Sequence, residues 1–324
     1  MRNYKGDTDL KTVILDAATL GDDIDLSPIY EVSSVTEYPF TPVDMIADRL
    51  KDADVVVTNK LKLGETNLAS ASSLKLICVT ATGYDNIDVE YCKQRGIALY
   101  NVPKYSTDSV AQLSISMVLY LATHLGSYRD YVHSGEYTAS GIANKLTPVY
   151  HELSSMTWGI VGGGEIGSAV AKVATAFGCK VLMCRRQPDE RYETCDIDTL
   201  CQRSDIISLH VPLNDGTRGM ISKERIDMMR DGVILVNVAR GAVTDEEAVT
   251  RAVESGKIGG LGVDVFTKEP FDKDHPYNRI LGRENVCLTP HMAWGSYEAR
   301  NRCIRIVADN IKSFEAGNKA NRII

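Results

Sequence analysis

The 324-residue sequence lacks long apolar runs, basic clusters and a signal peptide. No stretch reaches the roughly 18 consecutive apolar residues that a membrane span needs, and residues 1–11 contain no apolar core of a secretory signal. Lysine and arginine total 36 against 43 aspartates and glutamates, which gives a formal net charge of −7. These features argue against membrane and nucleic-acid partners and predict a soluble, cytoplasmic protein.

The cysteines also lack any pattern that would indicate a disulfide framework or a zinc site. Eight cysteines are scattered along the chain without a CxxC pair. Such spacing is typical of reduced thiols that pack as small apolar side chains. We therefore expect no structural metal and no disulfide.

Short apolar runs alternate with amphipathic stretches, a pattern typical of parallel α/β sheets. The length favours two domains. The first series of predicted strands comprises 12–16, 33–38, 54–58, 74–80 and 97–102, with a helix over 42–51. This block is predicted to be a small α/β domain.

A long apolar helix is predicted from Ser106 to Leu125, followed by a polar stretch to Ser155. A second series then predicts six strands, at 158–161, 180–184, 205–210, 233–238, 261–265 and 286–289. Six strands with intervening helices are what a doubly wound dinucleotide-binding domain requires. The last predicted helix, 296–314, would return to the first domain.

The strongest local motif is GxGxxG, which stands directly between a predicted strand and a predicted helix. Gly162 allows a tight turn, Gly164 lets the backbone approach a pyrophosphate, and Gly167 allows close contact between helix and strand. The free N–H groups of the following helix would bind the anion. This context predicts a dinucleotide site; the alternative is a glycine turn without a ligand.

The end of the next strand lacks the acidic residue that usually binds the ribose 2′-hydroxyl of NAD. Arg185 and Arg186 stand there instead, and the first carboxylate is Asp189, beyond Pro188. Two guanidinium groups at this place favour the 2′-phosphate of NADP. The alternative is a pair of solvated surface arginines.

Three further strand ends carry chemically active side chains: Arg240, then Asp264 and Glu269, then His291. Ligands bind at the carboxyl ends of strands in open α/β sheets. Arg240 precedes a predicted helix whose cap would be Thr244. Each side chain alone could be an ordinary ion pair or loop residue, but together they predict one active site.

The ordered motifs GIVGGGEIG, HVPLNDGTRGMI, VNVARGAVTDEEAV, GVDVFTKEP and TPHMAWGS resemble the D-2-hydroxyacid dehydrogenase family. Residues 80–88 and 101–112 resemble that family's substrate loop and hinge helix. The resemblance covers nearly the whole chain. It implies a Rossmann cofactor domain over 103–295 and a smaller flavodoxin-like α/β substrate domain over 1–102 and 296–324.

The resemblance also implies roles for individual residues. Arg240 would bind the substrate carboxylate and the polarised carbonyl oxygen, His291 would donate a proton to that oxygen, and Glu269 would orient the imidazole ring. On the substrate side it implies Thr82, Gly83 and Asn59. On the cofactor side it implies the three motif glycines with Glu165 and Ile166, then Arg185 and Arg186, His210 and Pro212 near adenosine, and Val238 with Asp264 near the nicotinamide.

Within the family, the opening residues 13–26 and 58–60 resemble the glycerate dehydrogenase/hydroxypyruvate reductase branch. This implies reduction of a small 2-keto acid such as hydroxypyruvate or glyoxylate. Arg185 and Arg186 favour NADP over NAD, and the family resemblance together with the long apolar helix from Ser106 to Leu125 suggests a homodimer. Reductases of D-lactate-type, branched or aromatic 2-keto acids stay open as alternatives, as does a non-catalytic NAD(H)-sensing scaffold. Formate dehydrogenases of the family pair their histidine with an amide side chain. The carboxylate of Glu269 at this place argues against that alternative.

Overall fold

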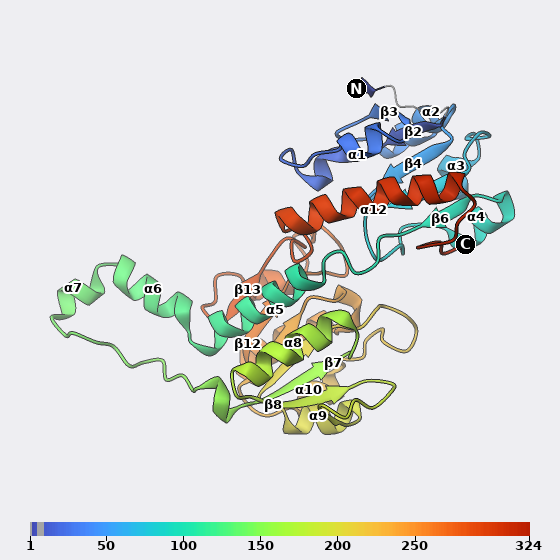
Figure 1. Cartoon of the computed structure of the whole chain (residues 1–324). Coiled ribbons are helices and arrows are strands. Elements are labelled where there is room, and N and C mark those ends of the chain that lie inside the picture. The colour runs from blue at the N-terminus through green and yellow to red at the C-terminus, as the bar shows by residue number, and fades with distance from the viewer. Residues whose placement is uncertain (1, 5–9) are drawn as a thin grey trace. The chain divides into compact units, whose positions relative to one another are not determined.

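The computed structural model describes residues 2–4 and 10–324 of the chain, and these divide into two compact units (Figure 1). Unit 1 comprises the described residues up to 106 together with residues 295–324, and unit 2 comprises residues 107–294. Each unit is an α/β structure built on one mainly parallel sheet. The predicted fold class is therefore confirmed.

Unit 1 contains a six-stranded sheet in the order β1-β3-β2-β4-β5-β6. The five predicted strands are parallel and form the flavodoxin-like order, while β1, which was not predicted, adds an antiparallel edge. The strands are β1 (Arg2–Tyr4), β2 (Lys11–Ile14), β3 (Ser34–Glu37), β4 (Val55–Thr58), β5 (Leu76–Val79) and β6 (Ala98–Tyr100). The helices are η1 (Ala17–Leu20), α1 (Ser27–Tyr30), η2 (Val43–Met45), α2 (Ile46–Leu50), α3 (Glu65–Leu68), α4 (Val89–Arg95) and α12 (Tyr297–Glu315).

Helix α12 brings the end of the chain back to unit 1, where it contacts α1 and β5. Its apolar residues Ile304, Val307 and Ile311 are fully buried. They recur at helical spacing and form one face, which explains why the amphipathic pattern at this end of the sequence becomes a helix on the sheet.

Unit 2 contains a seven-stranded parallel sheet in the order β13-β12-β11-β10-β7-β8-β9. All six predicted strands are present, and β9 is an additional strand of two residues, too short to show a periodic pattern. The strands are β7 (Thr157–Val161), β8 (Lys180–Cys184), β9 (Glu193–Thr194), β10 (Ile206–Leu209), β11 (Val233–Asn237), β12 (Ile258–Val263) and β13 (Val286–Leu288). The order reverses at β7, and this switch point is where doubly wound sheets bind nucleotides.

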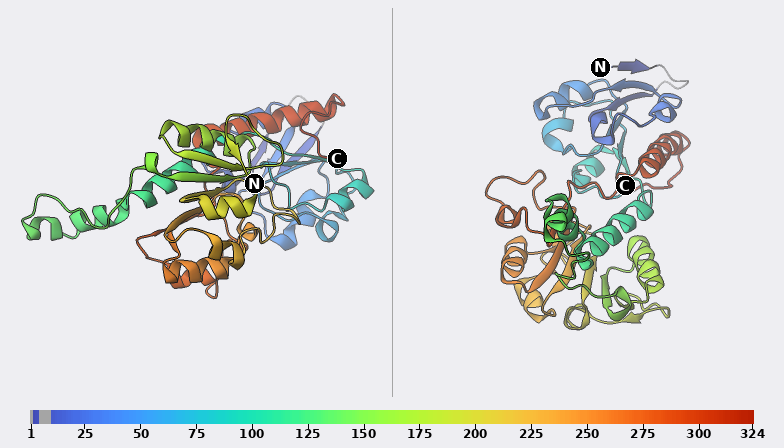
Figure 2. Two further views of the ribbon diagram at one scale, coloured as in Figure 1. Left: turned by 90° about the horizontal axis from the view of Figure 1, so that it is seen from below. Right: turned by 90° about the vertical axis from the view of Figure 1, so that its left-hand side faces the viewer.

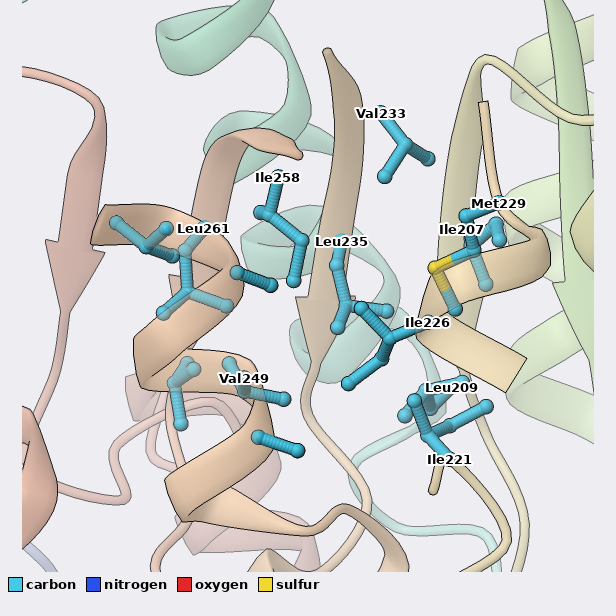
Figure 3. Packing of buried hydrophobic residues seen from close by; sticks show 14 of the residues in the cluster. Ile207, Leu209, Ile221, Ile226, Met229, Val233, Leu235, Val249, Ile258 and Leu261 are labelled. Atoms are coloured by element: carbon cyan, nitrogen blue, oxygen red, sulfur yellow. The ribbon is translucent and has the colours of Figure 1, made fainter. Parts of the chain in front are cut away.

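The helices of unit 2 are α5 (Thr107–Ala122), α6 (Leu125–His133), α7 (Glu136–Ser140), η3 (Leu153–Ser155), α8 (Glu165–Ala176), α9 (Ile197–Arg203), α10 (Lys223–Met228), η4 (Gly241–Val243), α11 (Glu246–Ser255) and η5 (Pro276–Ile280). Apart from α6 and α7, they pack around the sheet, and the central strands β10 and β11 are completely buried. In Figure 3, Leu235 of β11 packs among Ile207, Ile226 and Leu261. Because both faces of the strands are covered, their ends are held at fixed positions.

The predicted helix from Ser106 to Leu125 is wrong at its C-terminal end. It ends at Ala122, and His124 adopts a left-handed conformation with φ of 49°, after which α6 begins in a new direction. Residues 125–150 form an arm that extends from the body of unit 2 (Figures 1 and 2). In the described residues no single helix is long and apolar enough to cross a membrane. Helices α5 and α6 together have the length and apolar composition of a membrane span, but they are bent by 63° relative to each other.

Candidate active site

The glycine-rich turn after β7 brings the sheet and helix α8 into close contact. Gly162 has φ of 103°, and a Cβ there would lie 2.5 Å from the carbonyl oxygen of His210. A Cβ at Gly167 would overlap with the carbonyl oxygen of Gly162, whereas at Gly164 it would meet no atom within 4 Å. The turn is therefore closed toward the protein and open at Gly164, at the N-terminus of α8, as a pyrophosphate site requires.

His210, directly after β10, adds a buried polar ring nitrogen beside this turn. Trp158 Nε1 donates to Ser208 Oγ over 2.9 Å, and Ser208 Oγ lies 3.0 Å from His210 Nε2. Burial lowers the pKa of His210 to about 3, so the ring is neutral at pH 7.

No hydrogen-bond partner for His210 Nδ1 lies within the described part of the chain. A buried polar atom without a partner costs free energy of about 1–3 kcal/mol. A hydrogen-bonding group on a bound ligand would remove that cost. This nitrogen and the open turn at Gly164 both fit a dinucleotide cofactor.

A cleft of about 430 Å³ adjoins the same turn and is lined by Gly163, Gly164, Glu165, Ser168, Arg185, Asp189 and Arg191. Arg185 Nη1 lies 2.7 Å from Asp189 Oδ2, and Arg191 contacts both oxygens of that carboxylate at 2.8 and 2.9 Å. The guanidinium and the backbone N–H of Arg191, with Arg185, hold the pKa of Asp189 well below its usual range. Arg186 is exposed. Sequence reasoning missed Arg191, because its role appears only when the loop folds back.

The ends of β11, β12 and β13 are neighbours in the sheet, and they carry Arg240, Glu269 and His291. Glu269 Oε2 lies 2.6 Å from His291 Nδ1, and the backbone N–H of Phe266 donates to Glu269 Oε1 over 2.9 Å. Both side chains are partly exposed, at 30% for Glu269 and 22% for His291. The pairing inferred from the sequence is present, and one face of the pair is accessible to a ligand.

The segment of His291 is held by the buried carboxylate of Asp264. This carboxylate accepts hydrogen bonds from the hydroxyl of Thr289 and from the backbone N–H groups of Met292 and Ala293. Burial raises the pKa of Asp264, and these hydrogen bonds oppose the rise. His291 itself has φ of 52°, an uncommon conformation for a residue with a side chain. Asp264 therefore fixes the backbone from which the imidazole projects, and its contact with a nicotinamide stays a prediction.

Arg240 follows β11 in a turn that Asn237 closes. Asn237 Nδ2 donates to the carbonyl oxygen of Arg240 over 2.9 Å, and the N–H of Ala239 donates to Asn237 Oδ1 over 3.0 Å. Arg240 Nη1 in turn donates to the carbonyl oxygen of Ala239 over 2.8 Å. The turn thus holds the start of the arginine side chain at the strand end.

The predicted cap of the next helix is wrong by one residue. Asp245, not Thr244, is the N-cap of α11, since its carboxylate accepts from the N–H of Ala248 over 3.0 Å. The Thr244 hydroxyl instead donates to the carbonyl oxygen of Gly241 and closes η4. Both residue types are good caps, and the preceding 3₁₀ turn decides between them.

In unit 1, Asn59 and Thr82 follow β4 and β5 at the carboxyl edge of the sheet. The buried carboxylate of Asp16 accepts from the N–H groups of Asn59 and Lys60 at 2.8–3.1 Å, and burial raises its pKa. Thr82 Oγ1 donates to the carbonyl oxygen of Val102 over 2.8 Å. Substrate binding by Asn59, Thr82 and Gly83 stays a prediction. Sequence reasoning missed Asp16, although an acid directly after the first strand was the available signal.

The other predicted cofactor residues also lie at the carboxyl ends of strands in unit 2. Glu165 and Ile166 are the first residues of α8, Pro212 lies in the loop after β10, and Val238 directly follows β11. Their cofactor contacts stay predictions. Among the described residues, no group of three His, Cys, Asp or Glu side chains has the arrangement of a metal site.

Comparisons with known proteins agree with this geometry. The model of the D-isomer specific 2-hydroxyacid dehydrogenase NAD-binding domain matches residues 115–293. The chain is similar to a hydroxypyruvate reductase of Blautia hydrogenotrophica, with 34% identity over 321 residues, 96% of this chain and 99% of that protein.

Two solved structures are also similar over nearly their full length. One is a D-lactate dehydrogenase from Aquifex aeolicus complexed with NAD and lactic acid, with a TM-score of 0.85, 32% identity, and 96% of this chain and 98% of that chain covered. The other is an acyclic imino acid reductase (Bsp5) in complex with NADPH and D-Arg, with a TM-score of 0.84, 28% identity, and 97% and 100% of the chains covered.

Proposed function

Since this chain belongs to the D-isomer-specific 2-hydroxyacid dehydrogenase family, in the glycerate dehydrogenase/hydroxypyruvate reductase branch, we propose that Arg240, Glu269 and His291 are its catalytic residues. The enzyme reduces small 2-keto acids with a nicotinamide cofactor. The observation that carries the assignment is the 2.6 Å contact between Glu269 Oε2 and His291 Nδ1 at neighbouring strand ends. A carboxylate and an imidazole so placed are suited to proton transfer.

In the proposed mechanism, a reduced nicotinamide, when bound, would supply the hydride for reduction of the keto group. Because Glu269 contacts Nδ1, His291 donates its proton from Nε2 to the carbonyl oxygen. The guanidinium of Arg240 binds the substrate carboxylate and stabilises the negative charge that develops on that oxygen. In unit 1, the backbone N–H groups of Thr82 and Gly83 are proposed to contribute to substrate binding. The product is the D-2-hydroxy acid.

We propose hydroxypyruvate or glyoxylate as the preferred substrate. In steady-state assays against a panel of 2-keto acids, either should give a higher kcat/KM than pyruvate and than long apolar keto acids. The similarity to the Blautia hydroxypyruvate reductase supports this ranking, whereas the similarity to the Aquifex D-lactate dehydrogenase supports the alternative. Highest activity with pyruvate, phenylpyruvate or a branched keto acid would overturn the proposal.

We propose NADPH as the preferred cofactor, because Arg185 and Arg191 line the cleft beside the glycine-rich turn. Arg185 and Arg191 share the single carboxylate of Asp189, so this cluster keeps a net positive charge, and the exposed Arg186 adds another. A 2′-phosphate carries more charge than a carboxylate and presents more acceptor oxygens to the two guanidinium forks. If the 2′-phosphate displaces Asp189 from the two arginines, the gain in binding free energy is smaller, because the contacts between Asp189 and the arginines are lost.

The double substitution Arg185→Ala with Arg186→Ala should lower the preference for NADPH over NADH by about 10- to 150-fold, the equivalent of 1.5–3 kcal/mol for a charge-assisted hydrogen bond. The measurement is the ratio of kcat/KM values for the two cofactors. Asp189→Asn should raise the same ratio, since it removes the competing carboxylate. Arg203→Ala is the control, because Arg203 pairs with Glu193. Equal or better use of NADH by the wild-type enzyme would contradict the proposal.

We propose that the enzyme is a homodimer formed through the cofactor-binding units. Several large apolar side chains of the arm are exposed, including Leu125, Val132, Ile142, Leu146, Val149 and Tyr150. An extended segment of this composition gains stability when a second copy covers it. Sedimentation velocity should give twice the chain mass of 35.6 kDa.

The combined change of Ile142, Leu146 and Val149 to Asp should give the monomer mass. The control is Leu281→Asp, since Leu281 is another exposed apolar residue of unit 2 that lies outside the arm. A monomeric wild-type enzyme, or a dimer that survives the triple change, would exclude the arm as the interface.

We further propose a cytoplasmic location. All eight cysteines are free thiols in the structure, and thiols persist in reducing compartments.

A further inference from the structure

Glu246 and His275 form a buried polar pair that the proposed mechanism does not use. Glu246 is the first residue of α11, and His275 is the N-cap of η5. His275 Nε2 lies 3.0 Å from Glu246 Oε2, and the side chains are only 7% and 11% exposed. Burying such groups is costly even when they are paired. The pair is therefore better explained by what it holds in place than by a gain in stability.

The hydrogen bonds determine the tautomer of His275. The backbone N–H of Tyr277 donates to Nδ1 over 3.2 Å, so Nδ1 is an acceptor. The proton of the neutral ring is then on Nε2, from which it is donated to Glu246 Oε2. Glu246 thus receives one defined hydrogen bond from the loop that follows Glu269.

The other oxygen of Glu246 holds the beginning of that loop. The N–H of Thr267 donates to Glu246 Oε1 over 2.9 Å, and the N–H of the preceding residue, Phe266, donates to Glu269 Oε1 over 2.9 Å. Two consecutive peptide groups are therefore bound by two carboxylates, one structural and one in the active site. Any shift of this segment moves the hydrogen bond that orients Glu269 beside His291.

The same segment is packed tightly on its other sides. A Cβ at Gly241 would overlap with the backbone of Phe266 and Thr267, so the turn that follows Arg240 lies directly against these peptides. The Phe266 ring lies 4.8 Å from Phe271 and 6.2 Å from His275, measured between ring centroids. The segment therefore contacts both the arginine turn and the aromatic ring of His275.

We propose that Glu246, through its bonds to His275 and Thr267, is a positioning residue for the reaction. It fixes the peptide that orients Glu269, without touching the substrate. The proposal rests on the function proposed above for Glu269 and His291.

The test is a double-mutant cycle with Glu246→Gln and Glu269→Gln. A glutamine at 246 keeps an acceptor for Thr267 but places an NH₂ group against the Nε2–H of His275. We expect kcat to fall about tenfold, since small misplacements of catalytic groups are costly, with less than a twofold change in the Kd for NADPH measured by fluorescence. In the Glu269→Gln background, Glu246→Gln should have almost no further effect, because its target is already absent.

Two substitutions of His275 separate positioning from folding. In His275→Gln the amide nitrogen stands near the former Nε2 and can still donate to Glu246, so kcat should stay within about threefold of wild type. In His275→Asn the acceptor for Tyr277 is kept but the bond to Glu246 is lost, so kcat should fall as in Glu246→Gln. Thermal unfolding checks that the variants are folded.

The outcomes distinguish this proposal from the proposed function. If Glu269→Gln leaves kcat unchanged, the proposed active site is wrong. If Glu269→Gln is impaired but the effect of Glu246→Gln is unchanged in its background, or if both His275 variants behave alike, Glu246 is not a positioning residue for Glu269.

Discussion

Replacing His291 by alanine is expected to lower kcat for the reduction of a 2-keto acid by about 10²- to 10⁴-fold, the usual contribution of a general acid. The substitution removes the group from which the carbonyl oxygen receives its proton, and it leaves the glycine-rich turn intact. The Kd for the reduced cofactor should therefore change little. Steady-state kinetics and a fluorescence titration measure the two quantities.

The matched control is His151→Ala, because His151 is an exposed histidine of unit 2 outside the proposed site. It should retain wild-type kcat. Wild-type kcat in His291→Ala would show that the proton comes from another group. An equal loss in both variants would point to damage of unit 2 rather than to proton transfer.

Replacing Arg240 by lysine is expected to lower kcat/KM by about 10²-fold or more, equivalent to roughly 3 kcal/mol. Lysine keeps the positive charge but cannot offer two parallel N–H groups to a carboxylate. It also cannot donate to the carbonyl oxygen of Ala239 and to the substrate in the same planar geometry. The loss should appear in both kcat and KM, because the guanidinium is proposed to bind the ground state and the developing oxyanion.

Arg251→Lys serves as the control for this substitution. Arg251 lies on α11 of the same unit, is 69% exposed and pairs with Glu247, so its replacement should have little effect on activity or stability. If Arg240→Lys stayed within threefold of wild type, Arg240 would be a structural ion-pairing residue, and another cation would have to bind the substrate carboxylate.

Several parts of the fold and site follow from local sequence patterns. The strands of unit 2 are short apolar runs, and their burial on both faces matches the continuous patterns of β10 and β11. The spacing of Gly162, Gly164 and Gly167 predicts the turn that the structure contains. Pattern reasoning fails where an element is too short, as for β9, or where a single left-handed residue such as His124 ends a helix.

The sequence by itself determined the α/β class, the nucleotide-binding turn, and the presence of Arg240, Glu269 and His291 at strand ends. These features depend on neighbouring residues, whose spacing along the chain sets their geometry. Only the tertiary structure decided which side chains meet. Glu269 reaches His291 because β12 and β13 are adjacent, Asp189 lies between Arg185 and Arg191 because the loop folds back, and Glu246 meets His275 across 29 residues. Such contacts depend on strand order and loop path, which no local periodicity encodes.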